Sequence, residues 1–133
     1  MYVLDTAVCI DVLNGTSPAL VARLRAEDPA AIGLSCLTKA ELLYAARHGQ
    51  NVAANLRLLE LFLAPLRSLS FDDRCAEHYG LIRADLARAA TPIGPNDLLI
   101  AATARAHDLT LVTRNTREFG RIVGLRVADW QGP

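Results

Sequence analysis

Three acidic residues stand out because each lies directly beside a run of apolar residues. Asp5 follows the segment YVL, Glu41 is enclosed in TKAELLYAA, and Asp97 lies in IGPNDLLIAA. They are 36 and 56 residues apart, so only a tertiary fold can bring them together. Taken one at a time, the two aspartates can be ordinary helix caps, and Glu41 can complete a capping box with Thr38.

Taken together, the three acids predict a metal site. Carboxylates that converge repel one another and raise one another's pKa, an arrangement that a bound cation relieves. Mg²⁺ and Mn²⁺ prefer oxygen ligands of this kind. A metal ion held by carboxylates activates water and stabilises the leaving oxygen in phosphodiester hydrolysis. These residues therefore favour metal-dependent hydrolysis of a phosphate ester, provided that the fold brings them to one edge.

A fourth polar segment, LVTRNTREFGRIVGL at 111–125, follows a predicted strand. Glu118 adds a carboxylate, Asn115 adds an amide oxygen, and the arginines add donors for phosphate oxygens. The alternative interpretation is a polar loop with solvated arginines. The candidate contacts to a substrate phosphate are Thr6, Thr113, Arg114 and Arg117.

The apolar periodicity predicts the elements that must position these residues. Strands are expected at 2–5, 32–35, 66–71, 109–113 and 125–128. A polar-capped segment starts at Asp5, and helices are expected at 18–26, 38–48, 52–64, 72–90 and 97–107, with a short helical turn at 115–121. This alternation is typical of an α/β fold with a parallel sheet covered on both faces. In such sheets, sites gather at the carboxyl ends of the strands.

The composition fits one folded domain over residues 1–133. No apolar run approaches the ~18 residues that a membrane-spanning helix needs, and the start of the chain lacks the features of a signal peptide. We therefore expect no membrane association and a cytoplasmic location. The net charge is zero, which argues against a strongly basic nucleic-acid binder.

Several other residues receive no chemical role. The predicted helix at 52–64 is apolar on nearly all sides, so it is either buried in the core or shared with a partner. Asp11 is expected to be solvated. The three cysteines are expected to be reduced core residues, and the three histidines share no motif. These are Cys9, Cys36, Cys75, His48, His78 and His107.

Four motifs in series resemble the PIN-domain family, and in particular the VapC toxins of bacterial toxin–antitoxin modules. They are YVLDT, TKAELLYAA, IGPNDLLIAA and LVTRNTREFGRIVGLRVADW, and they cover nearly the whole chain. The resemblance implies a three-layer α/β/α sandwich around a parallel five-stranded sheet. It also implies an endoribonuclease that depends on Mg²⁺ or Mn²⁺, cuts RNA such as transfer RNA, forms homodimers and larger toxin–antitoxin assemblies, and is inhibited by a cognate VapB antitoxin.

By the same resemblance, the catalytic and metal-binding acids of the family fall on Asp5, Glu41 and Asp97. The fourth family position, often acidic, falls on Asn115. Either Asn115 itself orients water or phosphate, or Glu118 supplies the missing charge. Ala7 is a second departure, because the family commonly has a polar residue there, and its loss removes a hydrogen bond that steadies a metal ligand. Both departures suggest a site with one tightly held metal ion and a second that is bound weakly or only together with the substrate.

Three other protein classes place different demands on the residues of this chain. A receiver domain needs a lysine after its last strands, but Lys39 is the only lysine. A phosphatase of the haloacid-dehalogenase type needs a second aspartate where Ala7 stands. A PIN-like protein that binds RNA or a partner with weak or no catalysis stays open. Ala7 and Asn115 favour that alternative, and the three intact acids oppose it.

Overall fold

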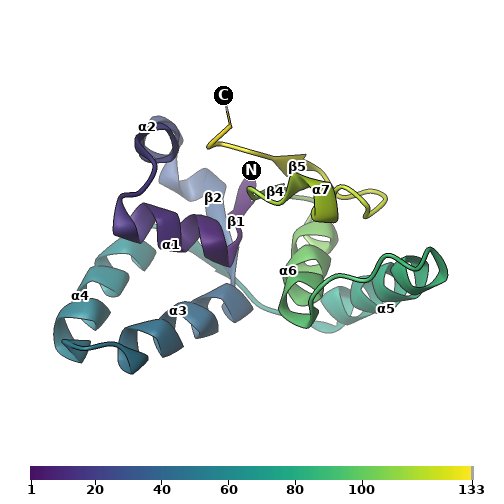
Figure 1. The fold of residues 1–133 in the computed structure, drawn as a ribbon, viewed down its shortest axis with the longest axis horizontal. Helices are drawn as coiled ribbons and strands as arrows, with labels where there is room; N and C mark the ends of the chain where they lie inside the picture. Colours follow the sequence, from purple (N-terminus) through teal and green to yellow (C-terminus); the bar gives the residue numbers. More distant parts are fainter. Residues whose placement is uncertain (133) are drawn as a thin grey trace.

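The computed structural model of the protein describes residues 1–132, and within this range it has five β-strands and seven α-helices (Figure 1). The strands are β1 (Tyr2–Leu4), β2 (Ile32–Ser35), β3 (Arg67–Leu69), β4 (Thr110–Val112) and β5 (Val127–Ala128). The helices are α1 (Thr6–Asn14), α2 (Pro18–Ala26), α3 (Cys36–His48), α4 (Val52–Leu63), α5 (Asp73–Arg88), α6 (Pro95–Ala106) and α7 (Thr116–Phe119). Every strand predicted from the sequence is present, although most are shorter than predicted.

The strands form one parallel sheet in the order β3-β2-β1-β4-β5, with β1 in the centre. Val3 pairs with Gly33 of β2 and with Leu111 of β4. Because the strands run in the same direction, the residues that follow β1, β2 and β4 emerge at one edge of the sheet. The predicted parallel five-stranded sheet is confirmed.

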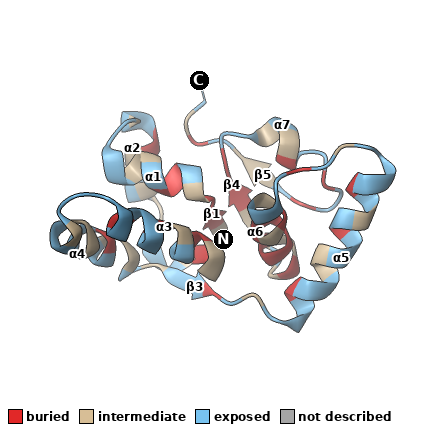
Figure 2. Ribbon diagram, turned by 60° about the horizontal axis from the view of Figure 1, so that its bottom comes forward, coloured by how far each residue is buried: buried red, intermediate tan, exposed pale blue. Residues whose placement is uncertain are grey.

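Helices cover both faces of this sheet, so the predicted three-layer sandwich is also confirmed. Successive side chains of a strand point to opposite faces. Val3 packs in the core beneath α5 and α6, whereas Leu4 packs in the core beneath α1 to α4. In Figure 2 the buried residues concentrate in the central strands and in α6, while α3, α4 and α5 carry exposed outer faces.

The starts of two helices differ from the sequence prediction. α3 begins at Cys36 because Ser35 is its N-cap and accepts a hydrogen bond from the backbone N–H of Thr38 at 3.1 Å. Thr38 therefore lies inside the helix, and the capping box that we predicted between Thr38 and Glu41 is wrong. α6 begins at Pro95 rather than at Asp97, which lies in the first turn and caps nothing.

The structure decides one open alternative and corrects one expectation. Of the two possibilities for α4, full burial in the core is excluded, because Leu58 and Leu61 are 62% and 67% exposed, while Leu59 packs into the core. Asp11 is not freely solvated. Its carboxylate is an ion-pair partner of Arg114, and it accepts a hydrogen bond from the Gln131 side chain at 2.9 Å. Some apolar side chains of α4 therefore lie on the protein surface, while others pack into the core.

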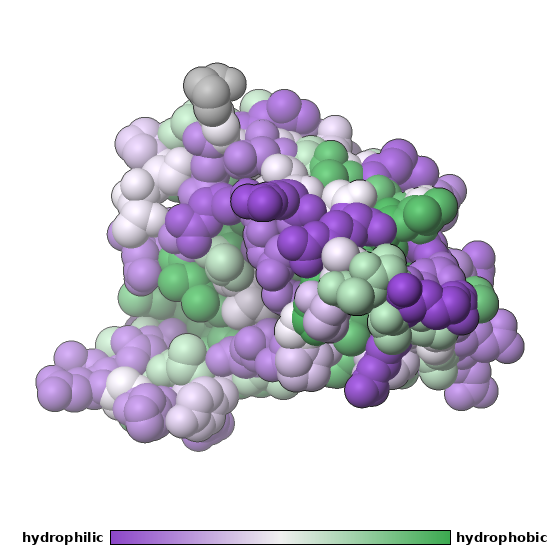
Figure 3. Space-filling view, turned by 45° about the vertical axis from the view of Figure 1, so that its right-hand side comes forward, coloured by the Kyte–Doolittle hydropathy of each residue, from purple (hydrophilic) through white to green (hydrophobic). Residues whose placement is uncertain are grey.

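Within residues 1–132, no helix combines the length and the apolar character that crossing a membrane requires. The face drawn in Figure 3 mixes hydrophilic side chains with smaller hydrophobic patches.

The cap of α3 gives a test of the fold. We expect Ser35→Ala to lower the free energy of unfolding by about 1–2 kcal/mol, because it removes an N-cap acceptor and leaves the Thr38 N–H buried without its partner. Urea denaturation measures this. Ser68→Ala, at an exposed position of the edge strand β3, is the control and should change stability by less than about 0.5 kcal/mol. Equal effects of the two substitutions would contradict the assignment of Ser35 as a structural cap.

Candidate active site

Asp5 lies directly after the central strand and is 6% exposed. It is the N-cap of α1, and its Oδ1 accepts a hydrogen bond from the backbone N–H of Val8 at 2.8 Å. Its own backbone N–H donates to the carbonyl of Val112 at 3.1 Å, which continues the pairing with β4. Asp5 is therefore held at both its backbone and its side chain, with one carboxylate oxygen engaged by the helix it caps.

Glu41 is held by hydroxyl groups rather than by a helix cap. Thr6, the first residue of α1, donates its hydroxyl to Oε1 of Glu41 at 2.9 Å. The hydroxyl of Thr6 is also hydrogen-bonded to that of Thr38 at 3.1 Å, and Thr38 is fully buried. This chain of hydroxyls ties α3 to α1. The engagement of Thr6 with Glu41 favours an orienting role over the phosphate contact that we expected.

Asp97 connects the acids electrostatically. It is partly buried in the first turn of α6. Burial raises the pKa of its carboxyl, and the charges of Asp5, Glu118 and Glu41 raise that pKa further. The geometry agrees with this electrostatic influence. Thr6, which follows Asp5, is hydrogen-bonded to Glu41, and Asn96, which precedes Asp97, lines the same hollow as Glu41.

Asp5 experiences opposing influences. Burial raises the pKa of its carboxyl, although hydrogen bonds from Thr113 and Val8 and the charge of Arg114 act to lower it. The net shift is upward. Two of the acids at this edge thus hold protons more strongly than an isolated aspartate does, which is the cost of collecting negative charge in a partly buried place.

Asn115 and Glu118 form one unit. Asn115 is the N-cap of α7, where its Oδ1 accepts from the backbone N–H of Glu118 at 3.4 Å and its amide donates to Oε2 of Glu118. Asn115 is exposed and Glu118 is half-buried. The charge of Glu118 raises the pKa of Asp97, and the amide of Asn115 holds the Glu118 carboxylate in place.

Of the other residues predicted to contact a substrate phosphate, one is buried beside Asp5 and two are exposed on the surface. Thr113 is 1% exposed and its hydroxyl accepts from the backbone N–H of Asn115 at 3.0 Å, so its burial favours support of Asp5 over contact with substrate. Arg114 is paired with Asp11 at 3.2 Å between Nε and Oδ2. Arg117 lies exposed on α7. Of the four predicted phosphate contacts, the two arginines remain accessible from solvent.

A shallow hollow borders the acids between α1 and α3. Its lining contains the carboxylate of Glu41 and the ring of Tyr44, which is 67% exposed. An extended chain in the hollow can therefore meet a carboxylate and an aromatic ring in the same place. The residues that line the hollow are Thr6, Ile10, Leu37, Ala40, Glu41, Tyr44 and Asn96.

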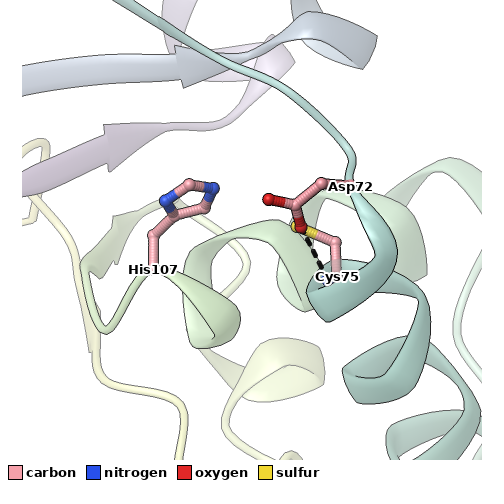
Figure 4. A group of neighbouring side chains, drawn as sticks. All are labelled: Asp72, Cys75 and His107. Atoms are coloured by element: carbon pink, nitrogen blue, oxygen red, sulfur yellow. Dashed lines mark hydrogen bonds between the residues drawn. The ribbon is translucent and has the colours of Figure 1, made fainter.

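The donor set at this edge consists of oxygen atoms, which fits Mg²⁺ or Mn²⁺. The carboxylates are not packed as a closed cage. In residues 1–132, the three metal-ligating side chains whose ligand atoms all lie within 4.8 Å of one another are elsewhere, at Asp72, Cys75 and His107 (Figure 4). A spread set of carboxylates suits Mg²⁺, which keeps several of its water ligands and binds one or two carboxylates directly.

In a comparison with known protein families, the family model of the PIN domain matches residues 2–125 of the chain. The chain belongs to the PIN-domain family. It is 40% identical over 129 residues to the tRNA(fMet)-specific endonuclease VapC of Shigella flexneri, and 36% identical to Ribonuclease VapC2 of Haemophilus influenzae, with 97% of each chain covered in both cases. Two similar solved structures are VapBC from Salmonella typhimurium bound to DNA and VapBC2 from Rickettsia felis bound to a promoter DNA fragment. They have a TM-score of 0.91 each and identities of 38% and 34%; the first match covers 97% of both chains, and the second covers 97% of this chain and 98% of the other.

The raised pKa of Asp97 predicts a pH-dependent effect on stability in a PIN domain freed of metal. Because folding raises this pKa, the contribution of Asp97 to stability is present below the ordinary value of about 3.9. It is lost as the pH rises through the raised value. We expect Asp97→Asn to increase the Tm at pH 7 in the presence of chelator, with an increase that shrinks as the pH approaches 4.

Thermal unfolding followed by circular dichroism measures this effect. Asp85→Asn is the matched control, since Asp85 is exposed and paired with Arg88 on the surface of α5. It should show no comparable pH-dependent gain. A lower Tm of Asp97→Asn at pH 7 would mean that the helix N-terminus stabilises the carboxylate more than burial and the neighbouring acids destabilise it.

Proposed function

We propose that this protein is a VapC-type toxin, an endoribonuclease that depends on Mg²⁺ or Mn²⁺ and acts on cytoplasmic RNA. The observation that carries the proposal is the electrostatic coupling of Asp97 to Asp5, Glu41 and Glu118 in a chain that matches VapC ribonucleases over nearly its whole length. The raised pKa values of Asp5 and Asp97 mean that these two charges destabilise the fold, so a catalytic use of the charge is the natural explanation.

The metal ion, when bound, activates a water molecule and neutralises charge on the cleaved phosphate. We assign its direct ligands to Asp5 and Asp97, with Glu41 and Glu118 acting directly or through water. The protein's own contribution is to hold these oxygens in place. Val8 and Thr113 orient Asp5, and Thr6 orients Glu41. Groups held in this way lose little entropy when the metal and substrate bind.

The proposed substrate is a single-stranded region of RNA, with transfer RNA as the first candidate because a similar protein is named a tRNA(fMet)-specific endonuclease. Sequence-specific proteins read RNA mainly in single-stranded loops, where bases can stack on aromatic rings. The exposed ring of Tyr44 lines the hollow beside Glu41, so it is placed to stack on a base. Arg114 and Arg117 supply donors for the phosphates.

We also propose a homodimer that is inhibited by a VapB-type antitoxin in a larger assembly, since similar structures were solved as VapBC complexes. Large apolar side chains remain exposed on α1, α3 and α4. An apolar surface of this kind marks a protein interface more often than a free face. The residues are Ile10, Leu13, Leu43, Tyr44, Leu58 and Leu61.

The central test is cleavage by the toxin purified away from its antitoxin. We expect it to cut transfer RNA in the presence of Mg²⁺ or Mn²⁺, and we expect excess chelator to stop the reaction. Asp97→Asn should lower the rate by about 100-fold or more, because it removes a charge that binds the metal. Sequencing of the RNA ends after brief expression in cells identifies the substrate and the bond.

Asp85→Asn serves as the control for an acid outside the site. Cleavage that survives both Asp97→Asn and chelator would refute a metal-dependent nuclease at this site. If the folded, metal-loaded protein cuts no RNA from a total RNA pool, the alternative of a PIN-like binding protein is favoured.

The pair of Asn115 and Glu118 gives a separate prediction. We expect Glu118→Gln to lower the cleavage rate and to raise the Mg²⁺ concentration needed for half-maximal activity, since the fourth charge is lost. Asn115→Ala should cost less, about tenfold, because it removes only a group that orients the ligand. Kinetics at several Mg²⁺ concentrations measure both effects. Full activity of Glu118→Gln together with loss of activity in Asn115→Ala would assign the fourth position to Asn115 instead.

A further inference from the structure

A second cluster of side chains, chemically unlike the acidic site, lies where α5 begins and α6 ends. Asp72 is the N-cap of α5, Cys75 is in its first turn, and His107 is the C-cap of α6. A carboxylate oxygen, the sulfur and a ring nitrogen from these residues all lie within 4.8 Å of one another. Figure 4 shows the imidazole of His107 and the carboxylate of Asp72 facing one another, with the sulfur of Cys75 beside the carboxylate.

The local contacts leave ligand atoms available. The Nε2 of His107 is buried and has no hydrogen-bond partner, which is an unfavourable situation for a ring nitrogen. The sulfur of Cys75 makes a weak contact with the carbonyl of Ser70 at 3.6 Å, and the pKa of this thiol is also influenced by the side chains of Asp72 and Thr103. Asp72 is exposed, and one of its oxygens accepts from the N–H of Cys75 at 3.0 Å, which leaves its other oxygen able to bind a cation.

The donor set selects the type of metal. A thiolate, an imidazole and a carboxylate are ligands of Zn²⁺, which binds cysteine, histidine and aspartate in tetrahedral sites. Mg²⁺ prefers oxygen ligands alone. From this geometry we propose that Asp72, Cys75 and His107 form a binding site for Zn²⁺ or a similar borderline-soft divalent cation, with water as the fourth ligand on the exposed side of Asp72. Binding transfers the proton of the Cys75 thiol to the solvent.

This site is separate from the acidic one. Asp97 lies near the start of α6 and His107 follows its end, so their separation of ten positions corresponds to about 15 Å along the helix axis. A metal ion at the second site links α5 to α6 and thereby fixes the helix that presents Asp97. It binds the folded protein through residues from two helices, so it stabilises the fold, and the stabilisation grows with the logarithm of the metal concentration once this exceeds the dissociation constant.

The test uses Co²⁺ as a spectroscopic substitute for Zn²⁺. The full chain, reduced and freed of metal, is titrated with Co²⁺, and the thiolate-to-metal charge-transfer band is followed. This band reports sulfur ligation and does not respond to metal bound at the carboxylate site. We expect it to saturate at about one ion per chain and to disappear when Zn²⁺ is added, because Zn²⁺ displaces Co²⁺ from such ligands.

Variants then assign the ligands. Cys75→Ser should abolish the band. His107→Gln and Asp72→Asn should weaken Co²⁺ binding by at least about tenfold, the lower limit seen when only an outer partner of a metal ligand is lost. Asp72→Asn preserves a good helix cap, so a loss of binding there does not come from a broken α5. Cys36→Ser and Asp97→Asn are the matched controls and should keep the band.

Thermal unfolding provides a second readout. Zn²⁺ should raise the Tm of the wild-type chain and of Asp97→Asn, but not that of His107→Gln. Absence of the charge-transfer band in the wild type would overturn the proposal. So would a band that depends on Cys36, or one that is unaffected by both His107→Gln and Asp72→Asn, since thiol binding without these partners is adventitious.

Discussion

The parallel pairing of β1 with β2 on one side and β4 on the other is the constraint on which the acidic site depends. Because these three short strands run in the same direction, the residues that follow them lie at the same edge of the sheet, where the strands have their carboxyl ends. Asp5, the start of α3 and Thr113 are therefore neighbours, although they come from the beginning, the first third and the end of the chain. α6, which lies on the other face of the sheet from α1 and α3, adds Asp97 to the same edge. This helix is buried more deeply than the outer helices.

The clustering of carboxylates lowers the stability of the folded protein. Burial and like charges raise the pKa of Asp97, and burial raises that of Asp5. Hydrogen bonds from uncharged donors offset part of this loss of stability and leave the carboxylates negatively charged. The N–H of Val8, the hydroxyl of Thr6 and the amide of Asn115 each hold one carboxylate. A site built in this way keeps its charge for a cation, and the departure from the family pattern at Asn115 becomes understandable, because its amide steadies the nearby Glu118.

The two ends of α6 present different chemistry. Near its start, oxygen ligands gather at the edge of the sheet, and at its end a ring nitrogen approaches a thiol and a carboxylate. Hard cations and borderline-soft cations prefer different donors, so the two sites that we propose at the ends of this helix would take different kinds of metal ion. The exposed apolar surface of α1, α3 and α4 lies in the layer on the other side of the sheet from α5 and α6.

The sequence by itself determined the order and type of the elements and the three acids, because strand alternation, helix caps and turn residues act over a few positions. Thus the helices expected to begin at residues 18 and 72 begin at Pro18 and at Asp73, within one position of the expectation. Local patterns failed where several candidates competed. Ser35 rather than Thr38 caps α3, and the buried hydroxyl of Thr38 is instead hydrogen-bonded to that of Thr6 in α1.

Tertiary structure alone decided which distant groups meet. The contacts of Asp11 with Arg114 and Gln131 join residues separated by more than a hundred positions, and no spacing rule reveals them. The same holds for His107 beside Asp72 and Cys75, since the histidine and the cysteine belong to different helices that pack side by side. Sequence periodicity reports which face of an element is buried, whereas the packing of one element on another determines which side chains come within bonding distance.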